Sequence, residues 1–307
     1  MTKVLVATDK PFAKVAVEGI RKIVEDAGFE LKLLEKYTEK SQLLEAVADV
    51  DAMIVRSDKI TREVLEAAKN LKIVVRAGAG YDNIDLDAAT EKKVVVMNTP
   101  GQNANAVAEL VLGMMVYMAR GQFDGKSGSE LMGKKLGLHA YGNVGRNVAR
   151  IAKGFGMEVC AYDPFVPAEA IAKEGVKSVC CVHTLFSQCQ YVSLHIPATP
   201  ETVGSINYEL MMSMPKNAVL VNAARGEVVN EADLVKVMQE RPDFKYISDI
   251  APGNAAEIAE KFAGRYYFTP KKMGAQTEEA NINAGLAAAA QIRDFIKEGV
   301  ATFQVNK

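Results

Sequence analysis

One segment of the chain sets its architecture: LGLHAYGNVG, residues 136–145. An apolar run leads into a turn with glycines at positions 142 and 145, and an amphipathic pattern follows it. A strand that passes into a helix through a G-x-G-x-x-G turn is typical of dinucleotide-binding βαβ units, although Ala140 stands here at the first glycine position. The middle glycine lets the backbone approach a pyrophosphate, which the helix N-terminus then attracts. The segment predicts a Rossmann-like lobe; a tight turn without a ligand is the alternative.

An acidic residue follows the turn at a suitable distance. Asp163 ends the next predicted strand, eighteen residues after Gly145, where the acid that binds the adenosine ribose is expected about 20 residues on. Its carboxylate would accept hydrogen bonds from both ribose hydroxyls and repel a 2′-phosphate, which favours NAD over NADP. The alternative is that Asp163 only begins a turn before Pro164.

Outside this segment, short runs of β-branched and aliphatic residues alternate with longer amphipathic patterns. This alternation predicts an α/β fold with parallel sheets built from βαβ units. We expect strands at 3–7, 52–55, 72–75, 94–97, 136–140, 158–162, 191–195, 218–222 and 245–249, and helices at 13–27, 107–120, 144–155, 231–239 and 277–298.

Composition narrows the class of protein. A chain of 307 residues suggests about two domains, and a formal charge of -1 argues against a nucleic-acid-binding protein. The longest apolar run, residues 110–119, is much shorter than the about 20 residues of a membrane-spanning helix. The first residues lack the pattern of a secretory signal, so we expect a cytoplasmic protein.

The four cysteines are Cys160, Cys180, Cys181 and Cys189, and their spacing does not match a zinc motif. We therefore expect reduced thiols and no metal site. The adjacent pair at 180 and 181 is the one candidate for reactivity, and inert burial is the more usual alternative.

Six ordered motifs are specific when taken together: VRS at 55–57, RAGAGYDNID at 76–85, NTPGQN at 98–103, VAE at 107–109, SLHIP at 193–197 and VNAARG at 221–226. With them the chain resembles the D-isomer-specific 2-hydroxyacid dehydrogenases, and among these the short D-3-phosphoglycerate dehydrogenases. The resemblance implies two Rossmann-like lobes and a homodimer. It places an NAD-binding lobe at residues 100–277, inserted into a discontinuous substrate-binding lobe at 1–99 and 278–307.

The resemblance also implies a catalytic arginine, which corresponds to Arg225. Its planar fork can hold a 2-oxo acid through carboxylate and carbonyl oxygens. The family's histidine follows Thr-Pro, but this chain reads TPKKMGA at 269–275, which puts Lys272 at the acid/base position. Two solvated lysines in a loop are the alternative.

The family's glutamate is replaced as well, because Asn254 stands at its position. Lysine has an ordinary pKa near 10.4, and an adjacent carboxylate would hold it as an ammonium ion. Loss of the carboxylate is therefore consistent with a lysine base. Glu257 could still supply a carboxylate through a different loop path.

The remaining site residues are implied by the resemblance. Substrate acid groups are expected at Arg56, Ser57, Arg76, Ala77, Gly78 and Ala79, although either arginine could instead pair with Asp82 or Asp85. NAD is expected at Tyr141, Gly142, Asn143, Val144, Gly145, Asp163, His195, Pro197, Thr202, Ala223, Ala224, Asp249 and Gly274.

The expected reaction is NAD-dependent oxidation of D-3-phosphoglycerate to 3-phosphohydroxypyruvate, in serine biosynthesis. A hydroxypyruvate or glyoxylate reductase would share the fold, the cofactor and Arg225. A non-catalytic NAD-sensing scaffold is the third interpretation, since the usual histidine and glutamate are both replaced.

Overall fold

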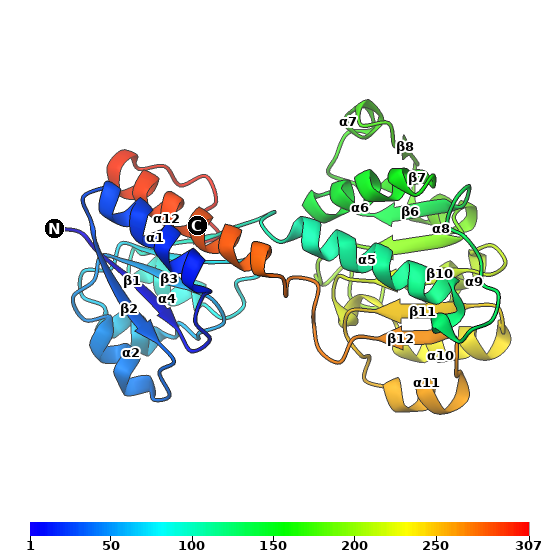
Figure 1. The fold of residues 1–307 in the computed structure, drawn as a ribbon, viewed down its shortest axis with the longest axis horizontal. Helices are drawn as coiled ribbons and strands as arrows, with labels where there is room; N and C mark the ends of the chain where they lie inside the picture. Colours follow the sequence, from blue (N-terminus) through cyan, green and yellow to red (C-terminus); the bar gives the residue numbers. More distant parts are fainter. Residues whose placement is uncertain (307) are drawn as a thin grey trace. The chain divides into compact units, whose positions relative to one another are not determined.

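The computed structural model describes residues 1–306 and divides into two compact units. Unit 1 joins Met1–Asn103 to Gln276–Lys307, and unit 2 is Ala104–Ala275. Figure 1 follows the chain from the blue strands of unit 1 through unit 2 and back to the red helix of unit 1. Both sheets are parallel, which confirms the expected α/β fold.

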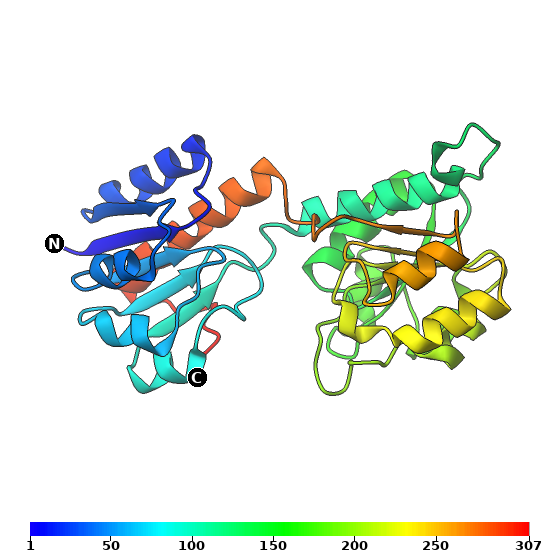
Figure 2. The ribbon, with the colours of Figure 1, turned by 90° about the horizontal axis from the view of Figure 1, so that it is seen from below.

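Unit 1 is a five-stranded sheet in the order β2-β1-β3-β4-β5. Successive residues of its strands alternate between two apolar layers: Val4 packs with α1 and α12, and Leu5 packs with the helices on the other face. In Figure 2 the helices α1 and α12 lie on the same side of this sheet. The elements are β1 (Lys3–Thr8), α1 (Lys14–Asp26), β2 (Glu30–Glu35), α2 (Lys40–Ala46), β3 (Ala52–Val55), α3 (Arg62–Ala67), β4 (Ile73–Arg76), α4 (Leu86–Glu91), β5 (Val95–Asn98) and α12 (Glu278–Glu298).

The segment after α12 returns to this sheet. Gln304 forms an antiparallel bridge with Met97, and the side chain of Asn306 accepts a hydrogen bond from the backbone N–H of Val96 at 2.7 Å. The final residues described are therefore an integral part of unit 1.

Unit 2 is a seven-stranded sheet in the order β12-β11-β10-β9-β6-β7-β8. Helices α5 and α6 pack on one face, and α8, α9, α10 and α11 pack on the other. Its elements are α5 (Ala104–Ala119), η1 (Gly121–Phe123), β6 (Lys135–His139), α6 (Asn143–Gly154), β7 (Glu158–Tyr162), α7 (Ala168–Lys173), β8 (Lys177–Ser178), α8 (Val182–Gln188), β9 (Tyr191–Leu194), α9 (Tyr208–Ser213), β10 (Val219–Asn222), η2 (Gly226–Val228), α10 (Glu231–Glu240), β11 (Lys245–Ser248), α11 (Ala255–Lys261) and β12 (Tyr266–Phe268).

The strand order of unit 2 reverses between β6 and β9. In an open parallel sheet, ligands bind outside the carboxyl ends of the strands at such a reversal. The turns after β6, β7, β9, β10 and β11 are therefore where a site is expected. Among the helices described, none is both long and apolar enough to cross a bilayer.

Candidate functional site

The turn between β6 and α6 has the geometry that a dinucleotide requires. Ala140 takes a left-handed conformation, φ +84°, at the position where the motif usually has glycine. A Cβ on Gly145 would lie 2.5 Å from the carbonyl oxygen of Ala140, so the third glycine is needed for the helix to pack against the turn. A Cβ on Gly142 would meet nothing within 4 Å, so the backbone there borders open space.

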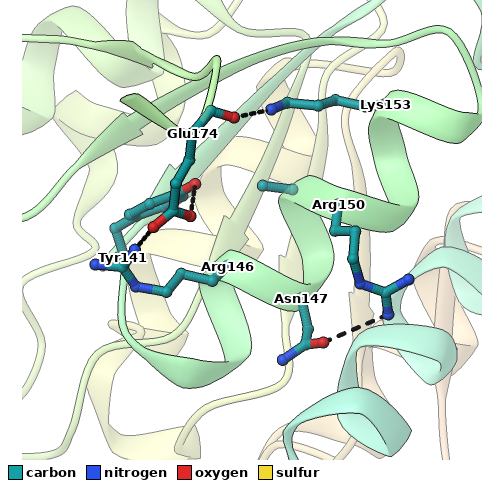
Figure 3. Close-up of a pocket in the computed structure, with 7 residues that line it drawn as sticks. Tyr141, Arg146, Asn147, Arg150, Lys153 and Glu174 are labelled. Carbon is teal, nitrogen blue, oxygen red and sulfur yellow. Dashed lines mark hydrogen bonds and ion pairs between the residues drawn. The ribbon is translucent and has the colours of Figure 1, made fainter. Parts of the chain in front are cut away.

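Tyr141 in the same turn directs its side chain into a groove that is lined by residues of α6 and by Glu174. Figure 3 shows its hydroxyl turned toward Glu174, to which it donates a hydrogen bond at 2.9 Å. The guanidinium of Arg146 lies 4.9 Å from the centre of the tyrosine ring and also pairs with Glu174. The tyrosine side chain therefore fixes the turn to α6, and its backbone N–H is donated to Asp163 at 2.7 Å.

Asp163 joins this turn to a hollow at the end of β7. Its second carboxylate oxygen accepts the backbone N–H of Phe165 at 2.8 Å. The hollow has a volume of about 530 Å³, and Asp163, Pro164, Val179 and Cys180 are among the residues that line it. The predicted ribose-binding acid is thus held at the edge of a space next to the glycine turn.

His195 follows β9, the strand that neighbours β6. Its backbone N–H is donated to the carbonyl of His139 at 2.9 Å. Both ring nitrogens of His195 are buried and have no hydrogen-bond partner among the described residues. Burial lowers the pKa of His195 to about 3 and that of His139 to about 4, so both rings are neutral near pH 7.

The loop after His195 is closed by a local hydrogen bond. The hydroxyl of Thr202 donates to the carbonyl of Pro197 at 2.5 Å. The open backbone at Gly142, the carboxylate of Asp163 and the unpartnered His195 ring together fit a dinucleotide, which needs an anion-binding turn, a ribose acceptor and polar groups along its length.

The turn after β10 brings the predicted catalytic pair together. The guanidinium of Arg225 donates to the carbonyl oxygen of Ala224 at 3.1 Å, and the Nζ of Lys272 donates to the same oxygen at 3.2 Å. Asn222 fixes this turn, because its buried side chain accepts the N–H of Ala224 at 3.0 Å and donates to the carbonyl of Arg225 at 2.9 Å. We did not predict Asn222 as a site residue, although a polar residue at the end of an apolar strand is a usable signal.

Asp249 holds the loop that carries Lys272. Its carboxylate accepts the N–H of Met273 at 2.7 Å and of Gly274 at 2.8 Å, and the hydroxyl of Thr269 at 3.1 Å. A Cβ on Gly274 would lie 2.9 Å from this carboxylate, which explains the glycine. Asp249 is therefore a positioning residue for the loop.

The two carboxylates closest in sequence or in space to Asn254 belong to Glu257 and Glu231, and each has a partner other than Lys272. The side chain of Asn254 donates to the backbone carbonyl of Glu231 at 2.9 Å, and the carboxylate of Glu231 accepts the N–H of Gly253 at 2.8 Å. Glu257 pairs with Lys261 at 2.8 Å, one turn further along α11. The structure thus places Glu257 in an ion pair on its own helix, while Glu231, which we did not single out, anchors the 253–254 loop.

In unit 1 the predicted arginines are neighbours at the carboxyl ends of β3 and β4. The guanidinium of Arg56 donates to Asn281 at 2.5 Å and lies 5.1 Å from the ring centre of Phe12, and its burial lowers its pKa. Arg76 donates to the backbone carbonyl of Arg56 at 3.1 Å. The Arg76 side chain covers Gly78, whose φ of +150° favours glycine. Ser57 and Ala79 are exposed beside them, and Ala77 is buried.

The chain is similar in sequence to known dehydrogenases. The profile of the D-isomer specific 2-hydroxyacid dehydrogenase NAD binding domain matches residues 104–264. The D-3-phosphoglycerate dehydrogenase of Methanocaldococcus jannaschii is 37% identical over 100% of this chain and 60% of its own length. The chain thus spans about three fifths of that relative. The hydroxypyruvate reductase of Thermotoga maritima is 41% identical over 67% of this chain and 70% of its own length.

A solved structure is also similar over the whole chain. The NAD+-bound 3-phosphoglycerate dehydrogenase of Entamoeba histolytica is 49% identical, covers 100% of this chain and 99% of its own, and superposes with a TM-score of 0.87.

Proposed function

Because the chain belongs to the family of D-isomer-specific 2-hydroxyacid dehydrogenases, we propose that it oxidises D-3-phosphoglycerate to 3-phosphohydroxypyruvate with NAD as the hydride acceptor. This reaction belongs to serine biosynthesis. The names of the Methanocaldococcus and Entamoeba relatives support this choice of substrate.

The observation that carries the proposal is the shared contact of Lys272 and Arg225 with the carbonyl of Ala224. A guanidinium group keeps its charge at any pH that proteins tolerate, whereas a lysine ammonium can lose its proton. One group can therefore bind the carboxylate of the substrate while the other exchanges a proton with the C2 oxygen.

The roles of the residues follow from this chemistry. Arg225 orients the 2-oxo acid and stabilises the negative charge that develops on its oxygen. Lys272 removes the hydroxyl proton during oxidation and returns it during reduction. NAD, when bound, would supply the acceptor for the hydride from C2. Asp249 keeps Lys272 in place through the backbone of Met273 and Gly274.

The proposed cofactor residues follow the carboxyl edge of the sheet in unit 2. Gly142, Asn143, Val144 and Gly145 would hold the pyrophosphate at the N-terminus of α6, and Asp163 would hold the adenosine ribose. His195, Pro197, Thr202, Ala223, Ala224 and Gly274 would contact the rest of NAD, together with the backbone of Tyr141.

The proposed substrate residues in unit 1 are Arg56, Ser57 and Arg76 with the backbone of 77–79. Planar guanidinium groups and a glycine-containing loop suit a molecule with both a phosphate and a carboxylate. Asn281 and Phe12 restrict the Arg56 side chain before any substrate binds, which lowers the entropy lost on binding. We further propose that the protein acts as a cytoplasmic homodimer.

A second candidate is a hydroxypyruvate or glyoxylate reductase, which the Thermotoga relative favours. The two activities differ in whether the arginines of unit 1 bind a phosphate. A third outcome, binding of NADH without turnover, would indicate a scaffold.

The test is NADH consumption by the purified protein with 3-phosphohydroxypyruvate, hydroxypyruvate, glyoxylate and pyruvate at matched concentrations. We expect strong preference for the phosphorylated acid. Preference for hydroxypyruvate or glyoxylate would replace the proposal by the reductase. No turnover with any of the four, in spite of NADH binding, would replace it by the scaffold.

A further inference from the structure

Two adjacent thiols at the end of β8 are accessible and close together. The Sγ atoms of Cys180 and Cys181 lie 3.8 Å apart, and both lie near the hydroxyl of Thr184, at 3.4 and 3.2 Å. Cys180 is exposed and Cys181 partly so, whereas Cys160 and Cys189 are buried. The predicted candidate pair is therefore the one that solvent reaches.

Cys180 also lines the hollow beside Asp163. Strand β8 pairs with β7, and the backbone N–H of Val179 donates to the carbonyl of Ala161 at 3.0 Å. This pairing sets the end of β8 next to the end of β7, where the proposed ribose acceptor stands. A group bonded to the Cys180 sulfur would consequently take up part of that hollow.

The geometry of the pair favours a bridging atom over a direct S–S bond. Consecutive Cα atoms lie about 3.8 Å apart, less than the roughly 4.4–6.8 Å of ordinary disulfides, and the sulfurs would have to approach to about 2.05 Å. A single pyramidal atom bonded to both sulfurs at about 2.3 Å, with an angle of about 95°, would hold them roughly 3.4 Å apart. The sulfurs, which are 3.8 Å apart, therefore lie much nearer to the second arrangement than to a disulfide.

The pair offers only two sulfur ligands, and this number limits which atom can bridge them. A zinc site needs about four ligands, and among residues 1–306 no group of three or more His, Cys, Asp or Glu side chains is placed to hold a metal. Trivalent arsenic that carries one organic group needs only two sulfurs. Hydrogen bonds from Thr184 lower the pKa of Cys181, which favours the nucleophilic thiolate.

We propose that Cys180 and Cys181 form a dithiol modification site for monosubstituted trivalent arsenicals, and that the adduct excludes NAD from the hollow beside Asp163. In the reaction two As–S bonds form and the arsenic–oxygen bonds break, while both thiol protons leave with the oxygen as one water. Arsenic keeps its oxidation state, so no oxidant is needed. The exclusion of NAD rests on the proposed function, and the formation of the adduct does not.

The test uses phenylarsine oxide on the purified, reduced protein. We expect one adduct per chain by intact mass, located at 180–181 by peptide mapping and removed by a small dithiol. NADH affinity, measured by NADH fluorescence, should fall at least tenfold in the adduct. Saturating NADH should slow adduct formation by a similar factor, a result that needs no variant.

Cys181→Ser is the matched variant. Cys181 is the N-cap of α8 and its sulfur accepts the N–H of Thr184, a role that serine fills well. The variant should bind NADH like the parent and lose the dithiol-specific adduct. An adduct at Cys160 and Cys189, or an adduct at 180–181 that leaves NADH affinity unchanged, would overturn the inference and leave the cofactor proposal standing. Failure of the unmodified protein to bind NADH would overturn the proposed function and the competition with it.

Discussion

The side chains of Lys272 and Arg225 meet at one acceptor, the carbonyl oxygen of Ala224, at 3.2 and 3.1 Å. They reach it from different parts of unit 2: Arg225 lies in the turn after β10, and Lys272 lies in the loop after β12. Two cationic side chains therefore converge on one backbone carbonyl oxygen.

Lys272→Met should lower kcat by about 10²- to 10⁴-fold, because the proton transfer loses its acid/base group. NADH affinity should stay the same, since the proposed cofactor residues are intact. Stopped-flow kinetics and NADH fluorescence measure the two quantities. Lys271→Met is the matched control, because it removes the neighbouring exposed lysine and should leave kcat unchanged. Retention of full turnover in Lys272→Met would show that the lysine is not the acid/base.

Asp249→Asn should both destabilise the protein and slow catalysis. An amide can accept only one of the two backbone N–H groups that the carboxylate accepts, so a buried hydrogen bond is lost. We expect a decrease of about 2–3 kcal/mol in the free energy of unfolding and a fall in kcat larger than the change in KM. Urea unfolding and steady-state kinetics provide the measurements. Thr269→Val removes only the third contact and should have a smaller effect on both; equal effects would argue against loop positioning.

Gly142→Ala should fold normally and bind NADH at least tenfold more weakly, a loss of about 1.4 kcal/mol. The added methyl group meets nothing in the protein, but it would occupy the space that the pyrophosphate needs. Gly154→Ala adds a methyl group to the same helix, also without a contact, and serves as the control. Unchanged NADH affinity in Gly142→Ala would place the pyrophosphate elsewhere.

The free energy of unfolding should fall as the pH drops from 6.5 toward 4. Burial lowers the pKa of His139 from 6.5 to about 4, so in this range the unfolded chain binds the proton and the folded chain does not. The neutral His139 ring contributes fully to the free energy of unfolding above pH 6.5. This contribution is lost progressively at lower pH, and the loss reaches up to about 3 kcal/mol. Urea unfolding of the parent and of His139→Phe, near pH 7 and near pH 4.5, measures how much of the pH dependence of the free energy of unfolding comes from His139. An identical pH dependence in both proteins would rule it out.

The sequence predicted the fold class well because the interior strands are mainly apolar. β6 (KLGLH), β9 (YVSL) and β10 (VLVN) lie between helices on both faces, and nearly all of their residues are buried. The strands that we did not predict are at sheet edges: β2, with the polar pattern ELKLLE, the two-residue β8 and the three-residue β12. β2 is half-exposed and lacks a clear apolar signal, whereas β8 and β12 are too short to give one.

The sequence motifs named candidate site residues, but they did not predict the contacts that hold these residues in place. Lys272 and Arg225 contact the same carbonyl oxygen, and their catalytic roles stay predictions. The three hydrogen bonds of Asp249 join residues 20 to 25 positions apart, and Asn222 acts through backbone atoms of its own turn. Such contacts depend on how strands lie beside one another, which local periodicity does not encode.

The return of α12 to unit 1 also imposes an order of events during synthesis. Its residues Ala284, Ala288 and Ile292 are part of the apolar layer that covers one face of the first sheet. A ribosome that adds about 5–20 residues per second needs on the order of 10–30 s to translate residues 104–275 before it reaches this helix. Throughout that time all strands of the first sheet exist while one of its faces stays partly uncovered. Unit 2 can thus complete its core on the ribosome before unit 1, although unit 1 begins first.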